Sequence, residues 1–192
     1  MRRILGLAGL VLTATTGCGY NTIQTLDEQA GAAKQQIEVQ LQRRADLVGN
    51  LVETVKGQAR QELEVFTEVT RARAGLTSAI QRGDPGEMAN ADAQMSGALR
   101  SLMINVEAYP QLKSDQAFLR LQDELAGTEN RIAVSRTDYN DAVRQYNTYI
   151  RRFPTVLTAK VVGARPREYF EVTDPSARQA PKVDFGTPKK DS

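Results

Sequence analysis

Residues 118–153 read FLRLQDELAGTENRIAVSRTDYNDAVRQYNTYIRRF and carry the clearest pattern in the chain. Apolar residues recur in this stretch every seven residues, and three more fall at the intermediate position of the repeat. Such a repeat draws one apolar seam along a helix and is typical of coiled-coil-like packing against a neighbouring helix. The seven-residue positions are Phe118, Leu125, Ile132, Tyr139, Tyr146 and Phe153, and the intermediate ones are Leu121, Ala142 and Tyr149.

Prolines mark the limits of this helix and of two others. They stand at positions 85, 110, 154, 166, 175, 181 and 188. Because a proline costs a helix interior about 3 kcal/mol, the proline-free windows between them predict helices. The first window predicts a single helix from about Thr25 to Arg82, roughly 85 Å long, which the turn sequence RGDPG ends. The second window predicts a helix from near Glu87 to Tyr109.

The apolar residues of the first two windows also follow helical spacing. Steps of three and four alternate along both windows, which predicts one buried face on each helix. After the second window, Ser114 or Asp115 is placed to cap the helix that contains the heptads. The first face comprises Ile23, Leu26, Ala30, Ala33, Ile37, Leu41, Ala45, Val48, Val52, Val55, Ala59, Leu63, Phe66 and Val69, and the second comprises Ala91, Met95, Ala98, Leu102, Val106 and Tyr109.

Together these patterns predict an all-α protein. The expected architecture is an antiparallel helical bundle with a very long first helix, a shorter second, a long third and a short fourth helix, then an irregular tail. The fourth helix is expected over 155–162 and should pack Val156, Leu157 and Val161 onto the bundle. Four of the seven prolines follow Gly163, which predicts an extended and poorly packed tail. Aromatic anchors at Tyr169–Phe170 and Phe185 are candidates for tying that tail down.

The N-terminus has the pattern of a secretory signal. In MRRILGLAGLVLTATTGC, residues 1–18, two arginines precede an apolar stretch from Ile4 to Ala14. As a helix that stretch is roughly 16 Å long, too short for the roughly 30 Å hydrocarbon core of a bilayer. The only cysteine, Cys18, follows directly, as in a bacterial lipoprotein signal, although Thr15 stands where such signals usually have Leu. We expect cleavage before Cys18 and acylation of this residue, including a palmitate-type chain; an uncleaved apolar anchor is the alternative.

These patterns divide the chain into three parts: a signal peptide over 1–17, a helical bundle over 18–163, and an extended C-terminal tail over 164–192. Gly19 follows the cysteine where an inner-membrane retention signal would have Asp. In a bacterium with two membranes, the expected location is therefore the outer membrane, facing the periplasm.

Composition excludes several classes of function. The 192 residues include no His and a single Cys, so the commonest general base and a multi-thiolate zinc site are both missing. The net charge of +2 comes from Arg2 and Arg3, and the remainder holds 23 basic and 23 acidic side chains. A nucleic-acid-binding protein needs a basic face to neutralise phosphates, so that class is not expected. No cofactor, metal or catalytic residue is predicted.

A polar set interrupts the apolar pattern and supplies the candidate site. In the first window it comprises Arg43, Asp46, Asn50 and Glu53, at steps of three, four and three. The heptad helix offers matching groups, namely Glu124, Glu129, Asn130, Arg136, Asn140 and Asn147. Three interpretations are open: an interhelical network that fixes register, a groove for a ligand or partner lined by Asn50, Asn130 and Asn140, or acid–base work by a pair such as Asp46 with Glu129. We favour the structural network.

Five stretches resemble the LemA family of bacterial membrane-anchored helical proteins. They are IEVQLQRRADLVGNLVETVKG (37–57), FLRLQDELAGTENRIAVSR (118–136), YNDAVRQYNTYIRRFP (139–154), ARPREYFE (164–171) and APKVDF (180–185). The resemblance extends from about Tyr20 to Phe185 and implies an antiparallel bundle with a very long first helix. The family usually has proline where this chain has Gly49. Its members often carry one N-terminal transmembrane helix, which the Cys18 signal replaces here, and the family has no established catalytic residues.

The expected function is therefore that of a lipid-anchored cell-envelope protein with a structural, scaffold or partner-binding role and no catalysis of its own. The expected partners are the membrane, through the lipid anchor, and another protein or a second copy of the chain. One alternative is a regulator or accessory subunit of an envelope enzyme, such as a membrane protease or a polymer-processing enzyme. The other is a small-ligand binder within the bundle.

Overall fold

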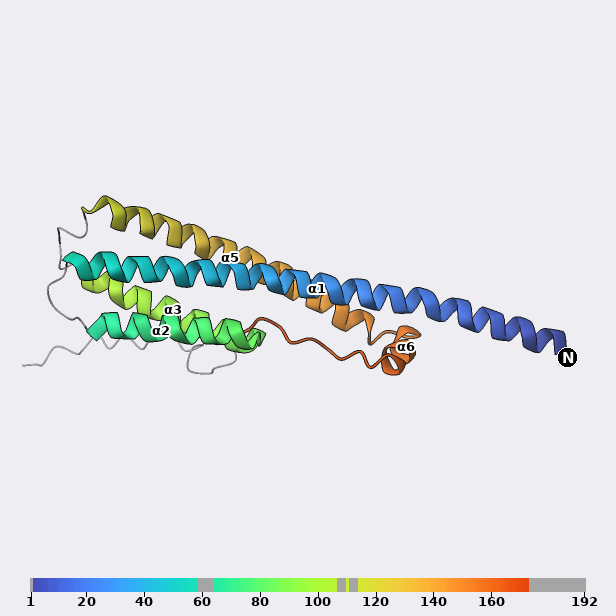
Figure 1. Ribbon diagram of the computed structural model, residues 1–192. Helices are drawn as coiled ribbons and strands as arrows, with labels where there is room; N and C mark the ends of the chain where they lie inside the picture. Colours follow the sequence, from blue (N-terminus) through green and yellow to red (C-terminus); the bar gives the residue numbers. More distant parts are fainter. Residues whose placement is uncertain (1, 59–63, 107–109, 111–113, 173–192) are drawn as a thin grey trace, which may run out of the picture.

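A bundle of long helices forms the body of the molecule (Figure 1). The computed structural model describes residues 2–58, 64–106, 110 and 114–172, with side chains described for 19–56, 66–106, 110 and 114–172. The helices are α1 (Arg2–Gln58), α2 (Glu64–Arg82), α3 (Pro85–Val106), α5 (Gln116–Tyr149) and α6 (Thr155–Val161). Over these described ranges the chain contains no strand, so the predicted all-α class and the very long first helix are confirmed.

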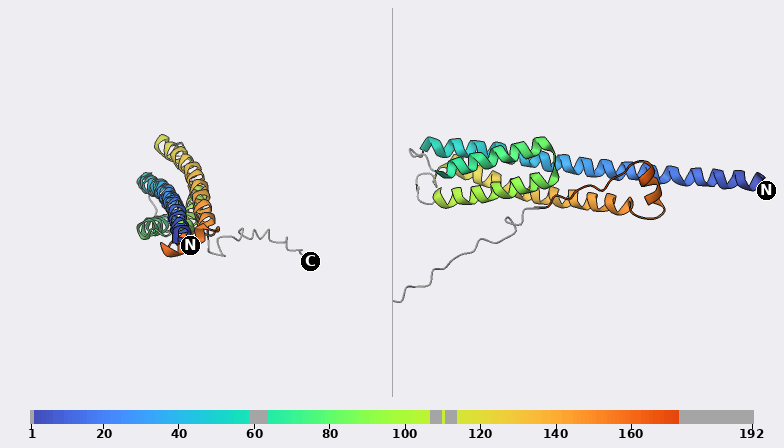
Figure 2. Two further views of the ribbon diagram at one scale, coloured as in Figure 1. Left: turned by 90° about the vertical axis from the view of Figure 1, so that its right-hand side faces the viewer. Right: turned by 90° about the horizontal axis from the view of Figure 1, so that it is seen from below.

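The prediction of a single helix from Thr25 to Arg82 is wrong for its C-terminal part. The chain turns back after Gln58, so that α2 runs antiparallel along α1 (Figures 1 and 2). The physical reason is burial: Phe66, Val69 and Leu76 are buried in the core that α1 also lines, whereas a straight helix would carry them beyond it. No proline or turn dipeptide marks residues 59–63, and the apolar spacing continues through them. Periodicity alone could not reveal this turn.

Gly49 on α1 makes room for a side chain of α2. Arg73 on α2 lays its guanidinium against this glycine and donates a hydrogen bond from Nε to the Ala45 carbonyl oxygen, at 2.8 Å. A Cβ on Gly49 would lie 2.9 Å from Arg73 Cζ, so any larger residue would displace the guanidinium. The glycine therefore leaves space for the Arg73 guanidinium against α1.

The turn between α2 and α3 has the chemistry that its sequence predicts. Gly83 adopts a positive φ of 68°, and its N–H donates to the carbonyl oxygens of Ala79 and Ile80. Asp84 accepts a hydrogen bond from the Glu87 N–H at 2.7 Å, and Pro85 begins α3, where its missing N–H costs nothing. The predicted apolar face of α3 is buried from Ala91 to Val106; Tyr109 lies outside the described residues.

Helix α5 confirms the heptad prediction over nearly its whole length. Asp115 caps it by accepting hydrogen bonds from the N–H groups of Ala117 and Phe118, at 2.8 and 2.9 Å. The seam residues from Phe118 to Tyr146 are buried, and the intermediate ones pack against the two hydrophobic clusters. Phe153 is the exception, because the helix ends at Tyr149 and leaves this side chain 81% exposed.

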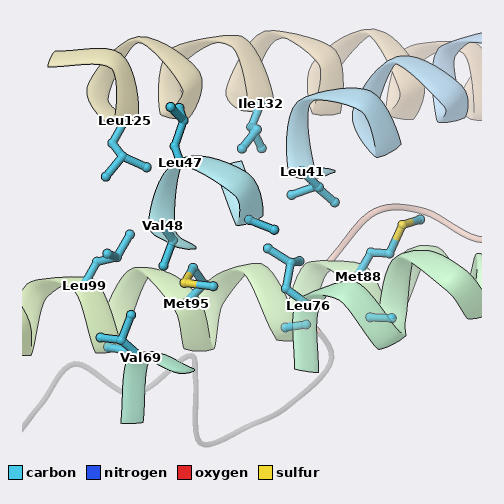
Figure 3. Close-up of a cluster of buried hydrophobic side chains, with 14 of the residues drawn as sticks. Leu41, Leu47, Val48, Val69, Leu76, Met88, Met95, Leu99, Leu125 and Ile132 are labelled. Atoms are coloured by element: carbon cyan, nitrogen blue, oxygen red, sulfur yellow. The ribbon is translucent and has the colours of Figure 1, made fainter. Parts of the chain in front are cut away.

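All four long helices contribute to one hydrophobic core (Figure 3). Leu125 and Ile132 of α5 point toward α1, and Met95 and Leu99 of α3 approach from the opposite side (Figure 3). The interface between α1 and α5 is the most extensive of the fold. A smaller cluster of Ile23, Tyr146, Ile150 and Ala159 closes the end of the bundle near α6.

Helix α6 lies where predicted but packs differently from the prediction. Only Ala159 is buried, while Leu157 and Val161 are 57% and 87% exposed. Seven residues form two turns, and the face that meets the bundle takes the small alanine because α1 lies close by. The expectation that Leu157 and Val161 pack onto the bundle is therefore wrong.

The chain after α6 returns along the bundle as an extended segment (Figure 1). The expectation of poor packing is wrong for residues 167–170, which α5 holds by hydrogen bonds described below. Phe170 is buried in the main core and confirms one of the two expected aromatic anchors. Phe185 lies outside the described residues.

The stretch predicted to be a signal peptide forms the first turns of α1. Within the described part of the chain, no helix combines the length and apolar character needed to span a bilayer.

The hairpin of α1 and α2 predicts a large cost for shortening Leu76. Leu76→Ala should lower the free energy of unfolding by about 2–5 kcal/mol, because it leaves a cavity between α1 and α2. The same change at the exposed Leu119 should cost no more than about 0.5 kcal/mol. Urea denaturation followed by circular dichroism measures both, and equal costs would contradict the packing of α2 against α1.

Candidate functional site

A buried arginine joins three helices in the middle of the bundle. Arg44 follows Leu41 by three residues and precedes Val48 by four, so α1 carries it on the same face as these core residues. Its side chain is only 3% exposed. Nη1 lies 2.6 Å from Asp92 Oδ1, and Nη2 lies 2.6 Å from Glu129 Oε2 and 3.0 Å from Ser96 Oγ. Arg44, Asp92, Ser96 and Glu129 are named here the Arg44 cluster.

The members of the Arg44 cluster come from three separate elements. Asp92 and Ser96 are one turn apart on α3 and therefore face the same way, while Glu129 projects from α5. A buried ion pair contributes little net stability, but removing one partner leaves a buried charge unmatched and typically costs about 3–5 kcal/mol. The cluster therefore enforces the relative positions of α1, α3 and α5 more than it adds stability.

Burial shifts the pKa of Asp92. Loss of solvation raises the pKa of this carboxyl above its ordinary value of 3.8, and the nearby charge of Glu129 adds to the rise. The positive charge and hydrogen bond of Arg44 oppose the rise without cancelling it. Arg44 Nε is also buried and has no hydrogen-bond partner among the residues that the structure describes.

A groove between α3 and α5 lies over the Arg44 cluster. It consists of two depressions, of about 690 and 370 Å³, which share Ser96, Arg100 and Glu129. Phe170 and Val172 of the extended segment line the far end of the larger depression. Arg100 on α3 and Arg136 on α5 are both exposed and stand on opposite walls. We call this feature the α3–α5 groove.

A second polar arrangement holds the extended segment against α5. Asn147 accepts a hydrogen bond from the Arg167 N–H and donates one to the Arg167 carbonyl oxygen, both at 2.8 Å. Asn140 makes the same pair with Phe170, at 2.8 and 3.3 Å. Two side-chain amides thus replace the backbone partners that a strand would have. We call Asn140 and Asn147 the asparagine clamp.

Tyr139 and Arg167 reinforce the asparagine clamp. The Tyr139 hydroxyl donates to the Glu168 carbonyl oxygen at 2.7 Å, and burial raises its pKa to about 12, so it remains a donor at neutral pH. Arg167 Nε donates to Asp27 Oδ1 of α1 at 2.7 Å, and its guanidinium lies 6.0 Å from the centre of the Tyr146 ring. The segment is therefore tied to both α1 and α5.

The structure places the eight predicted site residues in different surroundings. Arg43 and Glu124 form an exposed ion pair of 3.9 Å, and Asp46 accepts a hydrogen bond from Gln42 at 3.0 Å. Asn50, Glu53 and Asn130 are exposed, with Glu53 3.8 Å from Lys56. Of the eight, only Glu129 and Asn140 belong to the two arrangements described above. Asp46 and Glu129 have separate partners, Gln42 and Arg44.

Arg44 was missed because sequence reasoning assigned the polar role to its neighbour Arg43. The signal was present: Arg44 stands in the apolar stripe of α1, whereas Arg43, Asp46 and Asn50 follow one another on an adjoining, exposed face. A charged residue within a core stripe needs charged partners from the helices it faces. Asp92 and Ser96, four residues apart, were the matching pair on α3.

The polar side chains at these sites tie helices and the extended segment together. No three His, Cys, Asp or Glu side chains within the described ranges are grouped so as to hold a metal ion. The polar groups of the Arg44 cluster pair with one another, and the two asparagines of the clamp pair with backbone atoms of Arg167 and Phe170. This arrangement can position a groove and an extended segment.

The fold and these sites define an elongated all-α protein with a long first helix and polar ties between its helices. The family model described as LemA family matches residues 33–185, and this chain belongs to the LemA family. Magnetosome protein MamQ 2 and Magnetosome protein MamQ 1 of Paramagnetospirillum magneticum are each 30% identical over 188 residues, covering 86% of this chain and 69% of those proteins. Magnetosome protein MamQ of Magnetospirillum gryphiswaldense is 32% identical over 174 residues, or 79% of this chain and 64% of that protein.

The raised pKa of Asp92 predicts a specific pH dependence. Between the ordinary value of 3.8 and the raised folded-state value, the folded protein binds a proton that the unfolded chain releases. The stability that Asp92 contributes is therefore greatest at low pH and falls as the pH rises through this window. The unfolding free energy of the unmodified protein, minus that of Asp92→Asn, should decrease as the pH rises above about 4.

Urea denaturation of both proteins at a series of pH values measures this difference. Asp123→Asn, at an exposed position of α5, is the matched control and should leave the slope of the unmodified protein unchanged. A difference for Asp92→Asn that grows with pH would show that Arg44, and not burial, governs this carboxyl.

Proposed function

We propose that this chain is a membrane-anchored, non-catalytic scaffold of the bacterial cell envelope that binds a protein partner in the α3–α5 groove. The observation that carries the proposal is the Arg44 cluster beneath an open groove. A buried three-helix ionic tie holds the groove walls at a set separation, and such preorganisation favours binding because less order must be gained on association. The other charged side chains that line the larger depression, Arg100, Arg136 and Glu171, are exposed.

The lining carries charges of both signs, and its two exposed arginines on opposite walls suit acidic side chains of a polypeptide partner. Arginine presents several donors in a fixed plane and is enriched at protein interfaces. The partner can be an envelope enzyme, in which case the chain acts as its accessory subunit or regulator. A second copy of the chain is the other candidate occupant.

Small-ligand binding is the second candidate function, and the volume of the larger depression favours it. About 690 Å³ falls within the range of ligand sites. Such sites are lined mainly by apolar and aromatic side chains, whereas this lining includes Asp92, Arg100, Glu129 and Arg136. The charged lining favours the protein partner.

The anchor is proposed at Cys18. Two observations support it. The signal pattern ends at the only cysteine, and the chain belongs to the LemA family, which implies membrane anchoring. Acyl chains add about 0.8 kcal/mol per buried methylene, so more than one chain holds a protein firmly at the bilayer. The proposed location is the outer membrane, facing the periplasm, where two membranes are present.

The anchor is tested by replacing the acylated residue. Cells expressing the full chain should incorporate labelled palmitate into it and retain it in the membrane fraction, whereas Cys18→Ser should lose the label and appear in the soluble fraction. Gly19→Ala is the matched control, because a Cβ there makes only an ordinary contact, 3.7 Å from Thr158 Oγ1. A Cys18→Ser chain that stays with the membranes would refute the acyl anchor.

The groove is tested by photo-crosslinking in intact cells. A photoreactive amino acid at Arg100, on the groove wall, should give a defined adduct, while one at Glu53, exposed on α1 away from the groove, should not. Arg136→Glu should weaken the Arg100 adduct at least several-fold, since it reverses the charge of the opposite wall. An adduct of twice the chain mass would identify a second copy as the occupant. Equal adducts from Arg100 and Glu53 would contradict a specific groove.

A further inference from the structure

Helix α6 lies beside the point where the N-terminal apolar stretch leaves the bundle. A Cβ on Gly19 would lie 3.7 Å from Thr158 Oγ1, so α6 is in contact with the residue that follows Cys18. Ile23 of α1 and Ala159 of α6 belong to the same buried cluster, which attaches α6 to this end. Figure 1 shows α6 beside α1, with the first turns of α1 projecting beyond it. Whatever surface receives those first turns therefore faces α6.

The outer face of α6 is apolar and uncovered. Leu157 and Val161 are four residues apart and share a face, about 160° around the helix from the buried Ala159. Phe153, just before α6, adds a third large apolar side chain, and Val162 is also exposed. Large exposed apolar residues concentrated in one short segment mark a contact surface, since soluble surfaces seldom gather them. Phe153, Leu157, Val161 and Val162 are named the α6 patch.

Exposed basic residues accompany the α6 patch in the sequence. From Ala142 to Arg167 the chain contains no Asp or Glu, and neither does the stretch from Gly19 to Leu26 that packs beside it. Arg151, Arg152, Lys160 and Arg165 are exposed and make no ion pair with any residue that the structure describes. A chain that is otherwise balanced in charge thus concentrates positive charge at one end. A depression of about 380 Å³, lined by Arg144 and Arg152, opens at the same end.

We propose that this end of the molecule docks on an anionic lipid surface. The α6 patch enters the boundary between headgroups and acyl chains, and Arg151, Arg152, Lys160 and Arg165 pair with headgroup phosphates. Apolar and basic side chains in this combination are those of helices that lie in a membrane interface. A second copy of the chain is disfavoured as the occupant, because a two-fold contact would bring these basic groups against themselves.

The inference rests on the proposed membrane anchor and adds a second contact to it. An acylated Cys18 or an uncleaved apolar stretch would each hold Gly19 near the bilayer surface, and α6 with it. Docking of α6 would then set the tilt of the bundle, because two points of attachment restrict rotation about the anchor. The α3–α5 groove would thereby be held at a defined orientation to the membrane.

The chain contains no tryptophan, which permits a direct test in the full-length protein. Single substitutions Leu157→Trp and Val161→Trp report the α6 patch, and Val134→Trp, 61% exposed on α5, is the matched control. Each protein is reconstituted into phosphatidylglycerol-containing vesicles whose acyl chains carry bromine, which quenches tryptophan. Quenching at 157 and 161 should be at least threefold that at 134. Lys160→Glu combined with Arg165→Glu should remove most of this difference without changing the circular dichroism spectrum.

The outcomes separate the inference from the proposed function. If the chain floats with the vesicles but positions 157 and 161 are quenched no more than 134, the α6 contact is wrong and the anchor stands. If the chain does not float with anionic vesicles, the anchor and the α6 contact both fail. Equal quenching in vesicles of phosphatidylcholine alone would overturn the pairing with anionic headgroups. Shielding of 157 and 161 by dimer formation before vesicles are added would assign the patch to a second copy.

Discussion

The apolar seam between α1 and α5 is the constraint on which the rest of the structure depends. It is the longest interface of the fold and combines the heptads of α5 with the three- and four-residue steps of α1. Side chains as large as Tyr139 and Phe118 are fully buried along it. Burying each large apolar side chain contributes about 1.5–3 kcal/mol. A seam of this length can therefore offset the free-energy cost of burying polar groups in the interior. The α2–α3 hairpin then packs against α1 from the other side.

Sequence reasoning recovered the features that periodicity and turn chemistry encode. The heptads from Phe118 to Tyr146, a helix cap at Ser114 or Asp115 and a turn in RGDPG each have a local cause. The structure buries these heptad residues, places the cap at Asp115 and gives Gly83 a positive φ. The reversal of chain direction between α1 and α2 was not predicted, because helix-forming residues and apolar spacing continue from Gln58 to Glu64 in the sequence. The choice between one long helix and a hairpin is made by tertiary burial of Phe66, Val69 and Leu76, which no local pattern contains.

In the candidate site, too, some features follow from local sequence and others from tertiary packing. The presence of polar groups within the bundle could be predicted, but their partners depend on how far each helix is rotated about its axis. A shift of one residue on α1 separates the exposed Arg43 from the buried Arg44, and that shift decides which carboxylates are met. Asn140 was identified as an interior amide, yet its partner is the Phe170 backbone, which is 30 residues away along the chain. Contacts of this range depend on the course of the chain after α6, where the sequence has no regular period.

The spacing of the asparagine clamp has a consequence for the segment it holds. Asn140 and Asn147 are seven residues apart on a helix, which is about 10.5 Å, and their partners Phe170 and Arg167 are three residues apart in extended chain, about 10 Å. Two turns of helix and three residues of extended backbone thus have nearly the same length, and α5 sets the length of the returning chain between its two asparagines. Because Asn140 and Asn147 bond backbone atoms, they place no requirement on the side chains between Arg167 and Phe170. The asparagine clamp therefore constrains the length of this stretch more strictly than its composition. Inserting or deleting one residue would break the hydrogen bonds of one of the two asparagines.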